Sequence, residues 1–430
     1  MANASATGTT SAAGVPMEQR SGWRALEQRN YRLFVAGQLV SLIGTWTQSV
    51  AQTWLVYRLT GSATWLGFAT FCQQVPAFFF ATLGGLIADR HKRRTILVCT
   101  QTSAMVLAFV LAGLTLSGHV RVAHVLVLAA LLGAVQAIDS PTRQSFVLEM
   151  VGRENLTSAV AINTSMVTGA SFVGPAIAGV AIQAVGEGWC FFVNGVSFLA
   201  VIAGLLAMRD LPAPPAGRPR EPMTTRLLEG FRYVAGEERV RAVLVLLALT
   251  SLTALPTWTL MPVVASTVLH GDSRTLGWLM GASGAGGLVA GLFLAARPPR
   301  TFGTVALGCG LSGATLVAFS ATRTLLPALA LMVPLGAATM VQVATTNALI
   351  QAMTPDALRG RVMAIWIMIF MGFSPIGSVI AGKLTTAYGT PPVFAGAGLA
   401  CALGAMAFGR WLSLRHPTAT RANEGDAGAA

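Results

Sequence analysis

The chain contains an internal duplication in which both copies are strongly apolar. A shift of 203 residues places Leu131–Gly179 on Pro334–Gly382 without a gap, with 13 identities in 49 positions. Each copy is a long apolar segment, a short charged break and a second long apolar segment. A sequence that repeats in this way uses one folding unit twice. The duplication therefore predicts two similar halves, related to each other by a parallel repeat.

Composition places these repeats in a membrane. The 430 residues are 54% hydrophobic and 10% charged, whereas soluble domains carry about 25% charge. A helix needs roughly 20 apolar residues to cross a bilayer core, and runs of that length recur along the chain. We predict an all-α membrane protein with twelve transmembrane helices in two parallel-related six-helix halves. The expected helices are residues 31–57, 64–88, 95–117, 122–138, 156–185 and 189–208, then 242–269, 276–296, 302–321, 325–347, 362–387 and 392–409.

These spans divide the chain into five regions. They are a disordered tail (1–28), an N-terminal six-helix bundle (29–208), a linker (209–240), a C-terminal six-helix bundle (241–412) and a second disordered tail (413–430). The linker begins with a Pro-rich segment that cannot be helical. Apolar residues then recur on one face, at Leu227, Leu228, Phe231 and Val234. This pattern predicts an amphipathic helix on the membrane surface, which either only connects the halves or carries a regulatory or partner site.

The distribution of charge orients the spans. With both termini in the cytoplasm, only five of the 29 Lys and Arg residues lie in outer loops. Basic residues collect in cytoplasmic loops, so we predict that both tails are cytoplasmic. The net charge of +13 then follows from topology and does not indicate nucleic acid. Because nearly all the basic residues are arginine, a GC-rich bacterial genome is indicated, and with it the bacterial inner membrane.

Catalytic and metal-binding patterns are missing from the sequence. The five cysteines are scattered through apolar runs without metal-ligand spacing, and the five histidines do not cluster. There is no phosphate-binding P-loop and no pairing of a nucleophile with a base. We therefore expect no metal, no cofactor, no disulfide and no enzymatic activity, and we expect membrane lipids, protons and a small-molecule cargo as partners.

A charged motif stands between the second and third expected helices. It reads Gly85-Leu86-Ile87-Ala88-Asp89-Arg90-His91-Lys92-Arg93-Arg94. Gly85 permits close approach of two helices, and Asp89 is favourable beside a helix N-terminus. The motif resembles the signature loop of the major facilitator superfamily, Gly-x-Leu-Ala-Asp-Arg-x-Gly-Arg-Arg/Lys, with Lys92 in place of its second glycine.

The resemblance implies a conformational latch. In that superfamily the equivalent aspartate contacts the start of the eleventh helix and holds the two halves in one state. Here Arg359 and Arg361 near that start are the expected ionic partners of Asp89. The basic residues Arg90, Arg93 and Arg94 either belong to the latch or only contribute positive charge on the inner side.

Further segments resemble one branch of this superfamily, the enterobactin-exporter and macrolide-efflux branch of bacterial proton-driven exporters. The resemblance lies in residues 30–34, 38–46, 139–147 and 358–363. It implies outward transport of a medium-sized amphipathic compound, drug-like or siderophore-like, by proton antiport through alternating access in a monomer. Two alternatives stay open, an uptake permease for a small metabolite or lipid on the same fold and a non-transporting membrane sensor.

The fifth expected helix carries a partial antiporter signature. Gly174, Pro175 and Gly179 match the pattern Gly-x-x-x-Gly-Pro-x-x-Gly-Gly, while Ala170 and Ala178 replace glycines. Small residues at these positions permit a close helix crossing. The pattern therefore indicates either antiport or plain helix packing.

One acidic residue stands out near the membrane interior. Asp139 lies at the end of the fourth expected helix, and Arg143 follows four residues later. Ionisable groups inside membranes are costly and face a cavity or a partner. Asp139 is therefore the candidate for proton coupling. The alternative is an interfacial ion pair with Arg143, unless Pro141 ends the helix between them.

Uncharged polar and aromatic residues inside the spans are candidates for cargo contact. The superfamily resemblance places the first, fourth, seventh and tenth helices around the cavity. On these helices we expect amides and aromatic rings to contact cargo, at Trp46, Gln48, Gln52, Trp54, Gln136, Trp258 and Gln342. The alternative role for the amides is hydrogen bonding between helices. Pro256 and Pro262 are expected to bend or interrupt the seventh helix.

Overall fold

The structure is a computed structural model that describes residues 24–152, 154–209, 223–296 and 301–415, with side chains throughout except at 81–90, 223–227 and 295. Over these residues it is helical and contains no strand, so the all-α prediction is confirmed there. Ten segments in the described part are long and apolar enough to cross a membrane, namely α3–α6, Glu238–Val268 and α10–α14. The helix α1 is not among them and carries a row of Gln, Ser and Thr residues.

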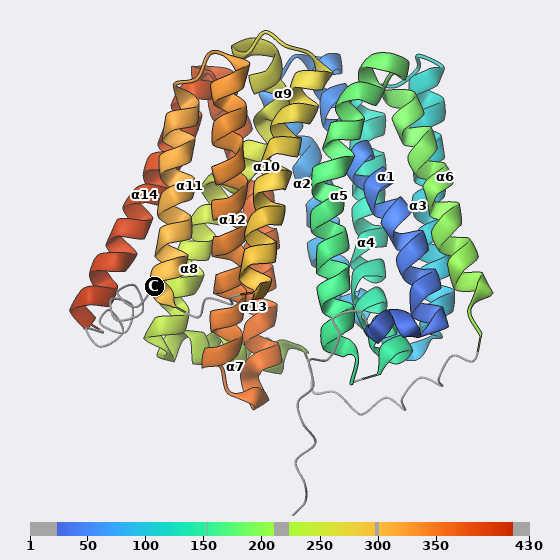
Figure 1. Cartoon of the computed structure of the whole chain (residues 1–430), viewed down its shortest axis with the longest axis horizontal. Coiled ribbons are helices and arrows are strands. Elements are labelled where there is room, and N and C mark those ends of the chain that lie inside the picture. Colours follow the sequence, from blue (N-terminus) through green and yellow to red (C-terminus); the bar gives the residue numbers. More distant parts are fainter. Residues whose placement is uncertain (1–23, 153, 210–222, 297–300, 416–430) are drawn as a thin grey trace, which may run out of the picture.

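The first group of long helices runs from the short helix η1 (Arg24–Glu27) to residue 207. It comprises α1 (Arg29–Thr60), α2 (Ala63–Arg90), α3 (Arg93–Leu116), α4 (Val122–Val151), α5 (Leu156–Val185) and α6 (Glu187–Ala207). The helices α1 and α3 both pack against α6, and α4 packs against α2 and α3. Figure 1 shows most of this group on one side of the molecule.

The second group follows a short helix, α7 (Met223–Gly236), which lies in the expected linker. It comprises α8 (Glu238–Thr253), η2 (Leu255–Leu260), α9 (Met261–Val263), η3 (Val264–Val268), α10 (Ser273–Ala296), α11 (Phe302–Ser320), α12 (Leu325–Met353), α13 (Asp356–Tyr388) and α14 (Thr390–Arg415). The helix α11 packs against α12 and α14, and α8 against α13 and α14. The helix α7 packs on α13, with Leu228 and Phe231 exposed.

Prolines act differently in two of the helices. The expected helix 122–138 was too short, because α4 continues through Pro141 to Val151. A proline removes one backbone donor, and beside it the hydroxyl of Thr142 donates to the Ile138 carbonyl at 2.7 Å. In contrast, Pro256 and Pro262 stand where α8 gives way to η2, α9 and η3. The predicted interruption of the seventh helix is thus confirmed.

The two groups touch along two helix crossings. The helix α2 packs against α13, and α5 packs against α10. Glycines make both crossings close: a Cβ atom added to Gly67 would lie 2.1 Å from the Ser378 carbonyl oxygen, and one added to Gly277 would lie 2.7 Å from the Gly179 Cα. Small residues at such crossings let two backbones meet. Contact between the groups therefore depends on the absence of side chains at these positions.

We call the end of the molecule at which α1 begins and α14 ends the terminal end, and the opposite end the loop end (Figure 1). Hydrogen bonds join the groups near the loop end. Gln183 of α5 donates to Asp272 at 2.8 Å, and Thr64 of α2 lies 3.0 Å from the Thr386 hydroxyl of α13. By contrast, each ion pair whose two side chains the structure describes lies within one group or joins α13 to α7.

Candidate functional site

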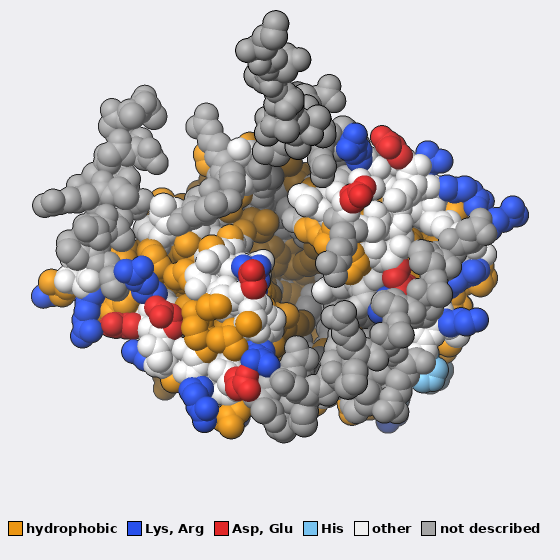
Figure 2. All heavy atoms as spheres, turned by 90° about the horizontal axis from the view of Figure 1, so that it is seen from below, with side chains coloured by type: hydrophobic (Ala, Val, Ile, Leu, Met, Phe, Trp, Pro, Cys, Tyr) orange, Lys and Arg blue, Asp and Glu red, His pale blue; other side chains and the backbone are white. Residues whose placement is uncertain are grey.

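A cavity of about 640 Å³ lies between the two groups. Its walls come from α1, α2, α4 and α5 of the first group and from η2, α10, α12 and α13 of the second. Figure 2 views the terminal end and shows the molecule hollowed between the groups on this side. Since the loop end is held together by the two crossings, the cavity opens toward the terminal end.

The lining combines apolar, amide and hydroxyl groups. None of the described residues that line the cavity carries a charged side chain. The large aromatic rings are those of Trp46, Trp258 and Phe370, and the amides are those of Gln48, Gln52, Gln73, Gln74 and Gln136. Drug-sized ligand sites have this build, a mostly apolar wall with a few polar groups, and volumes of about 300–1,000 Å³.

The amides differ in how the protein holds them. The Oε1 of Gln48 accepts a hydrogen bond from Asn194 of α6 at 2.8 Å. Gln52 and Gln136 make no side-chain hydrogen bond to another described residue, although both line the cavity. A polar group left without a protein partner inside a membrane domain needs water or a ligand. Gln52 and Gln136 are therefore available to a bound molecule.

Five of the expected cargo residues line this cavity and two do not. The five are Trp46, Gln48, Gln52, Gln136 and Trp258. Trp54 instead packs against the buried apolar cluster of the molecule. Gln342 is fully buried, and its Nε2 donates to the Thr250 hydroxyl at 2.6 Å. Gln342 therefore forms a hydrogen bond between helices, which is the alternative to cargo contact that the sequence left open for the amides.

Sequence reasoning missed several lining residues because it considered too few helices. The helices α2, α5, α10 and α13 also reach the cavity, with Gln73, Gln74, Ser171, Ser283 and Ser374 among their polar residues. These helices are the ones that cross between the groups, so their inward faces border the space that the groups enclose. The adjacent amides Gln73 and Gln74 inside an apolar run were the available signal.

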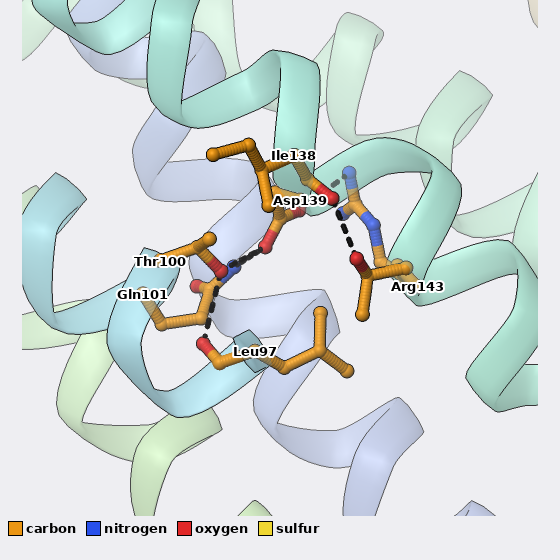
Figure 3. Close-up of polar contacts among 7 residues, drawn as sticks. Leu97, Thr100, Gln101, Ile138, Asp139 and Arg143 are labelled. Atoms are coloured by element: carbon orange, nitrogen blue, oxygen red, sulfur yellow. Dashed lines mark hydrogen bonds and ion pairs between the residues drawn. The ribbon is translucent and has the colours of Figure 1, made fainter. Parts of the chain in front are cut away.

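A buried carboxylate lies at the packed interface of α3 and α4, apart from the cavity lining (Figure 3). Asp139 is 5% exposed. Its Oδ1 accepts hydrogen bonds from the Thr100 hydroxyl and from the Gln101 amide, both at 2.8 Å. Its Oδ2 lies 3.2 Å from Nη2 of Arg143. Because α4 stays helical past Pro141, the i, i+4 pair forms.

This arrangement buries the carboxylate and leaves its partner more exposed. Three donors converge on Asp139, and buried charges need such pairing. The side chain of Arg143 is 30% exposed, whereas that of Asp139 is 8% exposed. The geometry is compatible with both expected roles, a structural ion pair and a proton site.

The described basic residues of the latch all have ion-pair or hydrogen-bond partners. Arg93 forms an ion pair with Glu149 of α4, and Arg94 donates to the Leu206 carbonyl at 2.7 Å. A cation beside the last carbonyls of a helix is favourable, so Arg94 stabilises the C-terminal end of α6.

The basic residues of α13 are likewise engaged. Arg359 lies 2.5 Å from Asp356, and Arg361 forms an ion pair with Glu229 of α7. The remaining latch residues fall outside the described side chains, namely Gly85, Asp89 and Arg90. The latch between Asp89 and the start of α13 therefore stays a prediction.

The small residues of α5 make contacts in two directions. A Cβ atom added to Gly174 would lie 2.4 Å from the Trp46 Cβ of α1, and one added to Gly179 would lie 2.9 Å from the Ser273 carbonyl oxygen of α10. Pro175 lies buried between them inside the helix. The segment packs α5 against its own group and against the other group.

Comparison with known proteins gives the family. The profile of the "Transmembrane secretion effector" family matches residues 20–424. The chain is 24% identical to the "Staphyloferrin A transporter" of Staphylococcus aureus over 383 residues, 88% of this chain and 95% of that one. It is 28% identical to the "Multidrug efflux pump Tap" of Mycobacterium tuberculosis over 378 residues, 84% and 88% of the two chains. It is 26% identical to the "Enterobactin exporter EntS" of Escherichia coli over 369 residues, 82% and 85% of the two chains.

Solved structures share the fold. A bacterial homologue of the human lysosomal transporter Spinster, inward-facing and unoccupied, matches with a TM-score of 0.70 at 14% identity, over 88% of this chain and 96% of that one. A POT family transporter in complex with 5-aminolevulinic acid matches with a TM-score of 0.71 at 9% identity, over 91% and 97%. With the apolar helices, these matches make the chain a multi-pass membrane protein. It belongs to the transmembrane secretion effector family of the major facilitator superfamily.

Proposed function

We propose that this protein exports a medium-sized amphipathic compound across the bacterial inner membrane by alternating access, in exchange for protons. In this proposal twelve spans form two six-helix halves, which correspond to the first and second groups. The terminal end faces the cytoplasm, because that topology leaves only five basic residues on the outer side. The observation that carries the proposal is the cavity between the groups, which opens at one end and is closed at the other.

In this proposal the two groups separate at the loop end during transport. At the loop end the groups are joined by glycine crossings and by hydrogen bonds such as that of Gln183 to Asp272. No covalent link crosses this boundary among the described residues. Rocking of one half against the other would break these contacts and form new ones at the terminal end, where the motif around Asp89 would act as the latch. In that state Asp89 would pair with the basic residues at the start of α13.

The lining supports an amphipathic cargo. Trp46 and Trp258 offer large apolar faces, while Gln52 and Gln136 offer donors and acceptors that the protein leaves free. The named relatives include a multidrug efflux pump and an enterobactin exporter, which supports the outward direction. One chain encloses the whole cavity, so the proposed working unit is a monomer.

Proton coupling is assigned to Asp139 in this proposal. An antiporter needs a group that binds a proton in one state and loses it in the other, and Asp139 is a carboxylate within a span, next to a partly exposed Arg143. Neutralisation would separate the pair and change how α4 packs on α3. The two helices then couple the proton to the conformation without any contact between Asp139 and the cargo.

Inverted membrane vesicles with an acidic lumen test both the proton antiport and the role of Asp139 in it. Amphipathic drugs and siderophores are added singly, and proton release from the lumen is followed with a pH-sensitive dye. We expect cargo-dependent release in the wild type and its loss in Asp139→Asn. Glu149→Gln is the matched control, because Glu149 is also an α4 carboxylate paired with an arginine.

The outcomes separate the roles. Release that disappears in Asp139→Asn and persists in Glu149→Gln supports coupling at Asp139. Release that persists in both variants leaves an exporter with Asp139 as a structural ion pair. Wild-type vesicles that accumulate a cargo without proton movement would overturn antiport.

A further inference from the structure

The described lining of the cavity is polar but uncharged. Five glutamines contribute to the lining, and no acidic or basic residue does so among the described residues. The ion pair of Asp139 with Arg143 is not part of the lining, although the two residues follow the lining residue Gln136 by three and seven positions on α4. Charges are therefore present in the bundle but not in the described lining.

An uncharged lining treats charged and neutral molecules differently. Amide and hydroxyl groups hydrogen-bond either kind, but they supply no opposite charge. A charged cargo loses its hydration when the cavity closes around it, and an unpaired buried charge is strongly unfavourable. The rings of Trp46 and Trp258 attract a cation only weakly in comparison. A neutral molecule suffers no such penalty.

We infer that the cavity selects its cargo by charge and accepts molecules that are uncharged in the bound state. The favoured class is a neutral, drug-sized amphiphile with several oxygen or amide groups, which fits the cavity of about 640 Å³. A deprotonated iron chelator and a permanent cation both fall into the disfavoured class. This inference rests on the proposed function to the extent that the cavity is the cargo site.

Gln52 is the position at which the selection can be reversed. It lines the cavity from α1, it makes no side-chain hydrogen bond to another described residue, and it has no charged neighbour in the lining. Gln52→Glu places one negative charge in the cavity at almost constant volume. Gln351→Glu is the matched control, because Gln351 is an exposed glutamine of α12 outside the lining.

The test is equilibrium binding of three dansyl probes of one scaffold to the full-length protein in lipid nanodiscs, without any gradient. The probes carry a hydroxyl, a trimethylammonium or a sulfonate group at the same position. In the wild type and in Gln351→Glu, we expect the hydroxyl probe to bind at least about tenfold more tightly than either charged probe, or about 1.4 kcal/mol. In Gln52→Glu, we expect the trimethylammonium probe to gain about tenfold and the sulfonate probe to weaken further.

Two results would overturn the inference. One is a charged probe that binds the wild type within about threefold of the hydroxyl probe. The other is an unchanged order of the three affinities in Gln52→Glu, with displacement by the unlabelled hydroxyl compound showing that the probes occupy one site. Binding is measured without a gradient, so the two experiments are independent. Vesicles that show no proton exchange would contradict the proposed function but not the preference for the neutral probe. Probes that bind without regard to charge would contradict this inference but not the proposed function.

Discussion

Gln48 and Gln52 lie one turn apart on α1, yet the protein holds only the first of them. Asn194 on α6 donates to Gln48, whereas Gln52 faces the cavity without a partner among the described residues. The sequence predicts that both are polar groups inside a span but cannot assign them different roles. The deciding partner lies 146 residues away along the chain, and only the packing of α1 on α6 brings it near.

The hydroxyl of Thr100 donates a hydrogen bond to the buried carboxylate of Asp139. It lies 2.8 Å from Oδ1 of Asp139, and both residues are buried. Hydrogen bonds to charged groups contribute about 1.5–3 kcal/mol, so Thr100→Val is expected to lower thermal stability in detergent by a free energy of that order. Ser103→Ala on the same helix is the control, because the Ser103 hydroxyl is exposed and bonds only the Cys99 carbonyl. Equal melting temperatures for the two variants would contradict this role of Thr100.

Among the helices, those with prolines show where sequence rules are sufficient and where they are not. The interruption after α8 follows from Pro256 and Pro262, and a propensity argument predicts it. The same argument wrongly ends the fourth helix near Pro141, because it omits the Thr142 hydroxyl and the packing of α4 on α2. Tertiary contact therefore decides whether a proline ends a membrane helix or only modifies it.

The packing of α5 against α10 holds the two groups together at the loop end. A methyl group at Gly179 would lie 2.9 Å from the Ser273 carbonyl oxygen, whereas one at Gly169 on the same helix meets nothing within 4 Å. Overpacking costs about 1–3 kcal/mol, so Gly179→Ala is expected to shift the protein toward the state that is open at the loop end, and Gly169→Ala is not.

Cysteines at 183 and 272 would report this shift, because the native side chains there are in hydrogen-bond contact. The cross-linking rate of that pair is expected to fall about fivefold or more in Gly179→Ala and to stay unchanged in Gly169→Ala. A cross-linking rate that is the same in both variants would show that the crossing does not limit closure.

At the scale of the whole molecule, the duplication puts unlike residues at equivalent positions. The 203-residue shift aligns Asp139 with Gln342. Both are buried and both hydrogen-bond to a threonine of a neighbouring helix, Asp139 to Thr100 and Gln342 to Thr250. The repeat is visible in the sequence and predicts that the two groups of helices share one arrangement. Which end is closed, and which helices border the cavity, depend on how the groups meet, and no local pattern encodes that.

If the proposed exchange operates, the absence of charge from the described lining also decides which force drives it. When a neutral molecule leaves and protons enter, every cycle carries net positive charge across the membrane. One elementary charge is worth about 2.3 kcal/mol per 100 mV. A potassium diffusion potential, positive inside inverted vesicles and imposed with valinomycin at equal pH, is therefore expected to drive cargo uptake, and uptake that ignores the voltage would contradict a neutral-for-proton exchange. Such a pump would keep working in a cell whose two membrane faces are at the same pH, powered by voltage alone.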